Sequence, residues 1–258
     1  MIVKQVDHLL TLFELFAQEK RPMTMTQLSG ALGLPKSSTH NLIETLSTRG
    51  YLYEVRQRGG FYPSRKLLAT GEAIAVGDPV TALINEFLGK MAYETGETAL
   101  LASQVKDDVI YLAVAESRQS IRYSAEVGSR RPVYATSGGK AILSTFRGQE
   151  LHEALQGIKF ADLRENTISD QDTLKKRIEE GLSQGFFLNL SEYTPDVTGI
   201  GVPIEVEGRQ LGLSVAGPNY RMEGRYPEFA KCLHKTADEI VKALQSAGLS
   251  ARYPYKSQ

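Results

Sequence analysis

The residues in this chain best suited to chemistry are short polar side chains that recur at helical spacing over residues 36–49. One face of this predicted helix carries Ser37, His40, Asn41, Glu44 and Thr48. The opposite face carries Thr39, Leu42, Ile43 and Leu46, which we expect to pack into a core. Short hydrogen-bonding groups suit contacts to base edges and phosphates better than the mixture of lysine and glutamate on an ordinary solvated face. The polar face therefore indicates a helix that reads nucleic acid, and a plain solvated helix is the alternative.

A second candidate group is the run Ser137-Gly138-Gly139-Lys140 at the start of another predicted helix. Glycines beside a lysine at a helix start can cradle an anion. A nucleotide phosphate loop does not fit, because Tyr134 stands where its first glycine belongs and Ala141 replaces the hydroxyl residue that binds magnesium. The run favours a small carboxylate. Equally, Ser137 could only cap the helix while the glycines allow close packing.

Local signals place the polar helix inside a helix-turn-helix. Thr24 and Gln27 are spaced as a capping box, Gly33 ends the first helix, and Pro35 sits in the first turn of the next. An upstream amphipathic helix, with apolar residues at positions 6, 9, 10, 13, 16 and 17, supplies the third helix. Two predicted strands over residues 51–55 and 61–62 then flank a turn that carries Arg56 and Arg58. This order of elements predicts a winged helix-turn-helix with a cationic wing tip.

The stretch LGLPKSSTH over residues 32–40, followed by Leu46 and Gly50-Tyr51-Leu52, resembles the N-terminal signature of the IclR-type (isocitrate lyase regulator) transcription factors. The resemblance implies a double-stranded DNA operator as partner. Where that family usually has arginine, this chain has Asn41, which can pair with adenine but cannot neutralise a phosphate. The residues expected to contact DNA are Thr26, Gln27, Lys36, Ser37, Ser38, His40, Asn41, Arg56 and Arg58.

Charge is distributed unevenly along the chain. Residues 1–65 hold eight Lys or Arg against five Asp or Glu, a net charge of +3, whereas the whole chain has 30 of each kind and is neutral. This basic excess is modest, and affinity for DNA grows with the number of phosphates neutralised. We therefore expect a homodimer or a dimer of dimers that binds both half-sites of a palindromic operator at once, so that the contacts at the two half-sites add.

Composition excludes several other classes of protein. No apolar run approaches the roughly 20 residues that span a bilayer, and the N-terminus lacks a signal-peptide pattern, so we expect no membrane partner and a cytoplasmic location. The single cysteine, Cys232, rules out a disulfide framework and is expected to be a buried structural thiol. The four histidines show no metal-ligand spacing, and no catalytic constellation is present. We expect no metal, no cofactor and no enzymatic activity.

The length of the chain and its helix-breaking residues predict four parts. These are a DNA-binding domain over residues 1–64, a linker helix over 65–77, an effector-binding and oligomerisation domain over 78–250, and a tail over 251–258. The second domain begins at Asp78 and Pro79, a helix-start signal. Its strand-like segments are 98–104, 109–116, 121–126, 186–190, 200–206 and 210–216, and its later helices are 137–146, 171–184 and 227–245. Without a regular βαβ repeat, this order predicts an α+β domain whose largely antiparallel sheet is flanked by helices.

Several stretches of this second domain resemble the effector domain of the IclR family, itself similar to the GAF small-molecule sensor fold. They are Val127-Gly128 with Arg131-Pro132, residues 135–141 (ATSGGKA), Gly185-Phe186, residues 201–204 (GVPI) and residues 213–218 (LSVAGP). The resemblance implies an effector pocket formed by Gly128, Ser137, Gly138, Asn189, Gly199 and Ser214.

In this resemblance Asn189 replaces an acidic residue of the family, Gly199 a cysteine and Ala216 a serine. We therefore expect a roomier, less acidic pocket for a carboxylic acid, aromatic or similarly bulky, or for a related amide. Two other functions stay open: a ligand-independent regulator whose second domain only oligomerises, and an enzyme fused to a DNA-binding module.

Overall fold

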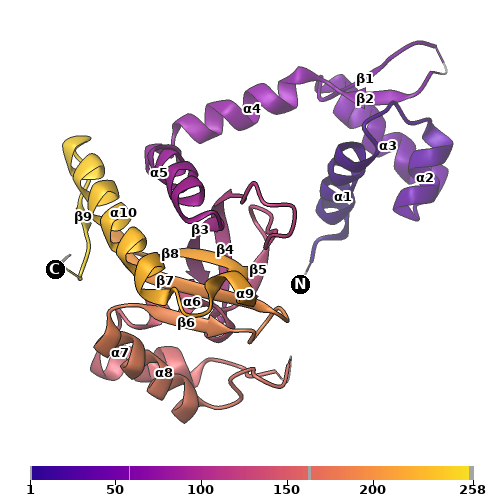
Figure 1. The fold of residues 1–258 in the computed structure, drawn as a ribbon. Coiled ribbons are helices and arrows are strands. Elements are labelled where there is room, and N and C mark those ends of the chain that lie inside the picture. The colour runs from indigo at the N-terminus through magenta and orange to yellow at the C-terminus, as the bar shows by residue number, and fades with distance from the viewer. Residues whose placement is uncertain (1, 58, 162–163, 256–258) are drawn as a thin grey trace. The chain divides into compact units, whose positions relative to one another are not determined.

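The structure is a computed structural model that describes residues 2–57, 59–161 and 164–255. The chain divides into two compact units, Met1–Asp78 and Pro79–Gln258 (Figure 1). Each unit has its own apolar core. Among the described residues, no single helix has both the length and the apolar composition needed to cross a bilayer.

The first unit is a winged helix-turn-helix followed by one further helix. Its elements are α1 (Lys4–Glu19), α2 (Met25–Leu32), α3 (Lys36–Thr48), β1 (Leu52–Glu54), β2 (Phe61–Pro63) and α4 (Arg65–Val76). The core contains buried Leu12, Phe16, Leu28, Ile43 and Leu46, which lie at helical spacing on α1, α2 and α3. Burial of these side chains holds the polar side of α3 outward.

Local chemistry sets the boundaries of α2 and α3. The Thr24 side chain accepts from Gln27 N while the Gln27 side chain accepts from Thr24 N, which confirms the capping box. Gly33 has φ 62°, in the left-handed region that ends a helix at little cost for glycine. Pro35 differs from the prediction, because it is the N-cap of α3 and the helix begins at Lys36.

The wing is fastened to the start of α2. Met23 and Phe61 pair by an isolated antiparallel bridge, so the residue before α2 extends the β1–β2 hairpin. Gly60, with φ 95°, lies so close that an added Cβ would approach the Met23 carbonyl carbon to 2.8 Å. Only glycine fits this position without moving the backbone.

The start of α4 is bonded to the end of α3. Ser64 Oγ donates to Gly50 O at 2.5 Å, and Lys66 Nζ donates to Arg49 O at 2.7 Å. The Lys66 ammonium also lies 5.0 Å from the centre of the Tyr51 ring. A cation at the C-terminal end of a helix is favourable, so the Lys66 ammonium stabilises the end of α3.

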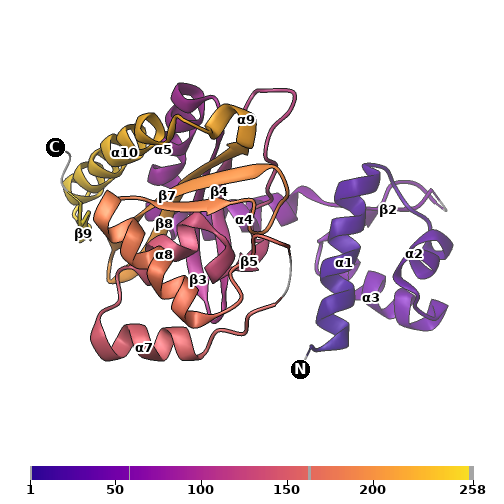
Figure 2. The same cartoon turned by 60° about the horizontal axis from the view of Figure 1, so that its bottom comes forward.

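The second unit consists of an antiparallel sheet between two layers of helices (Figure 2). In chain order its elements are α5 (Pro79–Thr95), β3 (Thr98–Val105), β4 (Asp108–Ala115), β5 (Arg130–Pro132), the 3₁₀ turn η1 (Val133–Ala135), α6 (Ser137–Leu143), α7 (Gly148–Gln156), α8 (Gln171–Gln184), β6 (Phe187–Leu190), β7 (Val197–Val206), β8 (Arg209–Pro218), α9 (Asn219–Met222), α10 (Tyr226–Ser246) and β9 (Ala251–Arg252). The strand order is β5-β4-β3-β8-β7-β6, and β9 pairs with β7. Every pairing is antiparallel, which confirms the predicted α+β architecture.

Large and small residues alternate along β7 and therefore lie on opposite faces of the sheet. Ile200, Val202 and Ile204 of β7 pack in the core shared with α5 and α10. Gly199 and Gly201, which alternate with them along the strand, face Ser137 at the start of α6. Because successive side chains point to opposite faces, one face of β7 is bulky and the other nearly bare. The bare face lets α6 lie close to the sheet.

The strand predicted over residues 121–126 is wrong. This segment has no ladder, and side chains satisfy two of its carbonyls: Thr98 Oγ1 donates to Tyr123 O at 2.5 Å, and Arg221 Nη2 donates to Ile121 O at 2.8 Å. The strand beside β4 is instead β5. The sequence pattern also missed α7, α9 and β9, and β9 lies within the stretch expected to be a tail.

Candidate functional site

The predicted reading face of α3 lies at the surface. Lys36, Ser37, Ser38, His40 and Asn41 are all exposed, as are Thr26 and Gln27 on α2. The core-facing prediction for the other side also holds, since Thr39, Ile43 and Leu46 are buried. The polar side of α3 is therefore open to a partner.

The beginning of α3 offers free backbone donors. Pro35 provides no side-chain cap, and the first α-helical bond runs from Thr39 N to Pro35 O. In the described part of the chain, nothing accepts from the backbone amides of Lys36, Ser37 or Ser38. Such amides at a helix N-terminus favour an anion, and a DNA phosphate is one.

His40 and Asn41 on α3 differ in whether the side chain has a partner within the protein. His40 Nδ1 lies 3.6 Å from Glu44 Oε2, with both groups exposed. The Asn41 carbonyl accepts from Thr45 Oγ1 at 2.7 Å, whereas its side-chain amide has no hydrogen bond to any described residue. Asn41 therefore keeps both its donor and its acceptor for a base edge.

The wing carries one of the two predicted arginines within the described residues. Arg56 is exposed in the turn between β1 and β2, which pair from Leu52 opposite Pro63 to Glu54 opposite Phe61. Arg58 was predicted to share this role and lies outside the described residues.

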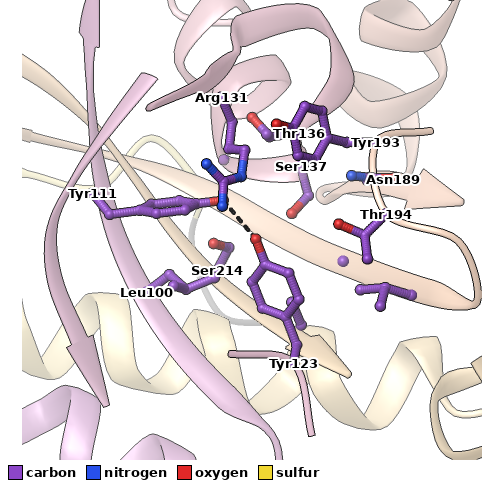
Figure 3. Close-up of a pocket in the computed structure, with 14 residues that line it drawn as sticks. Leu100, Tyr111, Tyr123, Arg131, Thr136, Ser137, Asn189, Tyr193, Thr194 and Ser214 are labelled. Atoms are coloured by element: carbon purple, nitrogen blue, oxygen red, sulfur yellow. Dashed lines mark hydrogen bonds between the residues drawn. The ribbon is translucent and has the colours of Figure 1, made fainter. Parts of the chain in front are cut away.

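The second unit contains a pocket against the bare face of its sheet (Figure 3). It is lined by Leu100, Tyr111, Tyr123, Arg131, Thr136, Ser137, Gly138, Asn189, Tyr193, Thr194, Val197, Gly199, Ser214 and Ala216. Five of the six predicted effector residues are among them. The sixth, Gly128, does not line the pocket: it has φ 84° and its amide donates to Tyr111 O at 2.8 Å, so it supports a lining residue instead.

Glycines bring Ser137 to this pocket. An added Cβ on Gly212 would lie 2.4 Å from Gly138 O, and one on Gly199 would lie 2.9 Å from Ser137 Oγ. Neither distance is sterically possible, so the start of α6 can approach the sheet only over these glycines. Thr136 rather than Ser137 caps α6, with Gly139 N donating to Thr136 Oγ1 at 3.0 Å. The Ser137 side chain is therefore left to face the pocket.

Lys140 takes no part in the pocket. Its ammonium is buried and donates to Glu192 Oε1 at 2.5 Å, to Glu192 Oε2 at 2.6 Å and to Leu188 O at 2.8 Å. Burial lowers the pKa of Lys140, and the Glu192 carboxylate partly offsets that effect. The lysine ties α6 to the segment after β6.

Asn189 holds the pocket walls as well as lining it. Its Nδ2 donates to Ala135 O at 2.7 Å, and its Oδ1 accepts from Glu192 N at 3.0 Å. These two bonds join the turn before α6 to the segment after β6. One N–H and one lone pair remain for a ligand.

Sequence reasoning missed Arg131 and three tyrosines as site residues. The hydroxyls of Tyr111 and Tyr123 lie 3.4 Å apart, and burial raises the pKa of Tyr111, so its phenol stays protonated at neutral pH. The rings of Tyr111, Tyr123 and Tyr193 surround the space left by Gly199 and Ala216. The cavity measures about 30 Å³.

An ion pair between Glu97 and Arg221 helps to position Tyr123 at the pocket. Buried Glu97 accepts from Arg221 Nε at 2.5 Å and from Arg221 Nη2 at 2.9 Å, and Nη2 also holds Ile121 O. Glu97 fits because Gly217 has no side chain: an added Cβ there would approach its carboxylate to 2.1 Å. The ion pair thereby fixes the segment that carries Tyr123.

Other chemistry is sparse in the described residues. They contain no group of three or more His, Cys, Asp or Glu side chains arranged to hold a metal ion. Cys232 is half-buried, lies 3.6 Å from Glu94 Oε2, and has a raised pKa because of its burial. A thiol in such surroundings is a weak nucleophile.

An exposed polar helix in a winged helix-turn-helix, together with a second unit that encloses a small polar pocket, defines a DNA-binding transcriptional regulator. Residues 5–56 match the IclR helix-turn-helix domain, and residues 73–242 match the domain described as the C-terminal domain of bacterial transcriptional regulator IclR. The chain belongs to the IclR family.

Individual relatives agree over nearly the whole length. The HTH-type transcriptional regulator KipR of Bacillus subtilis is 26% identical over 245 residues, covering 93% of this chain and 97% of that protein. The Thermotoga maritima IclR structure aligns with a TM-score of 0.79 at 21% identity, covering 93% of this chain and 98% of that one. An IclR homolog from Microbacterium hydrocarbonoxydans, solved with 4-hydroxybenzoate, aligns with a TM-score of 0.74 at 19% identity, covering 94% and 99%.

Proposed function

We propose that this regulator binds a palindromic double-stranded operator as a homodimer or dimer of dimers, and that a small organic acid in the pocket of the second unit controls that binding. The observation that carries the proposal is the pocket's composition: its described lining includes one arginine and several hydroxyl groups and no carboxylate. Such a lining favours a negatively charged ligand.

DNA contact is assigned to one surface of the first unit. On this proposal Lys36, Ser37 and Ser38 position the protein on phosphates, while His40 and Asn41 contact base edges. Thr26 and Gln27 of α2 and the wing residues Arg56 and Arg58 contact the backbone beside the groove. Two copies are needed because a net charge of +3 on residues 1–65 neutralises few phosphates.

The pocket residues Ser137, Gly138, Asn189, Gly199 and Ser214 are assigned to the effector. Gly128 acts through Tyr111 on this proposal. Aromatic acids are the first class to test, because a structurally similar IclR homolog was solved with 4-hydroxybenzoate and because three tyrosines line this pocket. The protein acts in the cytoplasm, by binding and not by turnover.

Control by the effector requires unequal affinity for two states. On this proposal, the paired DNA-binding units can adopt two spacings. An acid changes operator affinity only by the factor by which it binds one spacing more tightly than the other. Typical couplings correspond to changes of about 5- to 150-fold in affinity.

A gel mobility shift on the protein's own upstream intergenic DNA tests the proposal, with and without a panel of aromatic and short aliphatic acids that includes 4-hydroxybenzoate. We expect one class of acid to change operator affinity at least several-fold. Operator binding that no acid alters would favour the ligand-independent alternative, in which the second unit only oligomerises.

A further inference from the structure

Arg131 is the feature of the pocket that the proposed function leaves unexplained. It is the one positively charged residue in the described lining, which includes no Asp or Glu to balance it. An unbalanced cation next to a small cavity is unfavourable unless another group completes the site.

Two contacts fix the Arg131 guanidinium and leave its buried Nε unpaired. Nη1 donates to Arg130 O at 2.6 Å, and the guanidinium carbon lies 5.0 Å from the centre of the Tyr193 ring. Nε is buried and has no hydrogen-bond partner among the described residues. Buried donors are almost always paired, so the unpaired Nε points to a missing acceptor.

The groups that face Arg131 across the cavity can all donate. The guanidinium and the hydroxyls of Tyr111, Tyr123, Ser137 and Ser214 point toward the same space (Figure 3). Hydroxyl groups also accept, but only an acceptor with negative charge satisfies several donors and the guanidinium together.

We propose that Arg131 is the anion-binding residue of this pocket and that the effector is recognised as a carboxylate and not as its neutral amide. This inference rests on the proposed effector function and decides between the acid and the amide. The Nε edge of a guanidinium matches the two oxygens of a carboxylate, which gives both charge and geometry.

The cavity volume sets the position of the ligand. About 30 Å³ holds roughly two water molecules, which is comparable to a carboxylate group and too small for the rest of an acid. The carboxylate therefore lies at Arg131, and the body of the acid displaces a ring of Tyr123 or Tyr193. Both tyrosines lie outside helices and strands, whereas Tyr111 is fixed in β4.

The test uses the full-length protein and two pairs of probes with nearly equal shape: benzoate with benzamide, and acetate with acetamide. Thermal shift and calorimetric titration are run at constant ionic strength on the parent, on Arg131→Met and on Arg130→Met. Arg130 is an exposed neighbour on β5 and is the matched control. The parent and the control are expected to bind the acid more tightly than the amide.

In Arg131→Met, affinity for the acid is expected to fall roughly 10- to 100-fold, as for loss of a charge-assisted hydrogen bond. Affinity for the amide changes little, so the preference for acid disappears. Without ligand, Arg131→Met melts at or above the parent temperature, because an unbalanced cation has been removed. A residue that only held Tyr193 in place would instead lower the melting temperature.

The outcomes separate the two proposals. An acid preference that survives in Arg131→Met overturns the role of Arg131 and leaves effector control intact. A parent protein that none of the acids stabilises, even at tens of millimolar, overturns Arg131 as an anion site together with the proposed class of effector. Tighter binding of benzamide than of benzoate by the parent overturns recognition of a carboxylate by Arg131, and control of operator binding by a small effector remains.

Discussion

The two proposed sites of this protein are built in opposite ways. The residues proposed to contact DNA come from one short stretch, residues 26–58, and those that are described are exposed. The side-chain amide of Asn41 makes no hydrogen bond to a described residue, whereas its backbone carbonyl accepts from Thr45 Oγ1. The pocket residues come from segments between Leu100 and Ala216 and are held by bonds to the segments around them, such as those of Asn189 to Ala135 and Glu192. The first surface is open to a partner. In the second, the polar walls are held before a ligand arrives, and on our proposal only the ring of Tyr123 or Tyr193 has to move.

This difference predicts whether a substitution changes ligand or DNA affinity, the stability of the fold, or both. On the first surface, removal of a side chain changes DNA affinity and leaves folding nearly intact, since surface substitutions have small effects on stability. Around the pocket, a substitution that never touches the ligand can change both folding and affinity, because α6 is held to the sheet by buried contacts.

The largest effect is expected from Lys140→Met. The variant leaves the Glu192 carboxylate buried without its ammonium partner, which costs about 3–5 kcal/mol. Urea denaturation followed by a probe in the second unit should show the loss, while the first unit keeps its own transition. The double variant Lys140→Met with Glu192→Leu should recover most of the loss, because apolar residues can replace a buried pair.

An exposed ion pair provides the control for this experiment. Arg177 Nη1 lies 2.9 Å from Glu180 Oε2 on α8, and both side chains are largely exposed. Arg177→Met should therefore cost at most about 1 kcal/mol. Equal losses from Lys140→Met and Arg177→Met would show that burial of Lys140 does not stabilise the second unit.

Gly212→Ala is expected to have the next largest effect. The added methyl group would meet the backbone of Gly138, so α6 must move away from β8, at a cost of about 1–3 kcal/mol. Because Gly138 and Ser137 line the pocket, affinity for any effector should fall as well, and titration of the purified variant measures both effects.

The control for Gly212→Ala lies in the same unit. Gly89 is within α5, and an added Cβ there would meet no atom within 4 Å. Gly89→Ala should stabilise the protein by about 0.5–1 kcal/mol through helix propensity and leave ligand affinity unchanged. If Gly212→Ala behaves in the same way as Gly89→Ala, then close packing of α6 is not what shapes the pocket.

The same contrast explains how much of the molecule the sequence could predict. The capping box of Thr24 and Gln27 and the left-handed Gly33 are signals within a few residues of each other, and the structure has both. Alternation likewise identified β3, β4, β7 and β8. Their antiparallel pairing followed from the absence of βαβ repeats.

The pocket could be predicted only in part. The glycines and serines of α6, β7 and β8 occur in recognisable motifs, so Ser137, Gly199 and Ser214 were found. Tyr123 lies in the segment wrongly predicted as a strand, and Tyr193 lies in a segment for which no element was predicted. Tyr123 is placed by Thr98, which lies 25 residues away in sequence. These tyrosines line the pocket beside Gly199 and Ala216, and no motif in the sequence indicated that they would.

Asn41→Ala is expected to change which DNA is preferred more than how tightly DNA is bound. Loss of the two-pronged contact that an asparagine makes to adenine should cost about 1–3 kcal/mol at one base pair of each half-site and little at the others. Selection from a randomised operator library measures the change. Gln18→Ala removes an exposed amide from α1 and serves as the control, which should keep the parent's preference. An unchanged base preference in Asn41→Ala would place the reading surface elsewhere on the unit.

The smallest effect is expected from Arg56→Ala in the wing. An arginine that neutralises one phosphate contributes to all sequences alike, so affinity should fall by a similar factor for operator and unrelated DNA. The slope of log affinity against log salt should become shallower by about 0.9 for each DNA-bound copy. Arg209→Ala removes the same charge from an exposed position on β8 and is the matched control. If both variants change the slope equally, the effect comes from net charge and the wing does not contact DNA. If only Arg56→Ala does, a phosphate contact lies at the wing, where the backbone is held in place by the close approach of Gly60 to Met23.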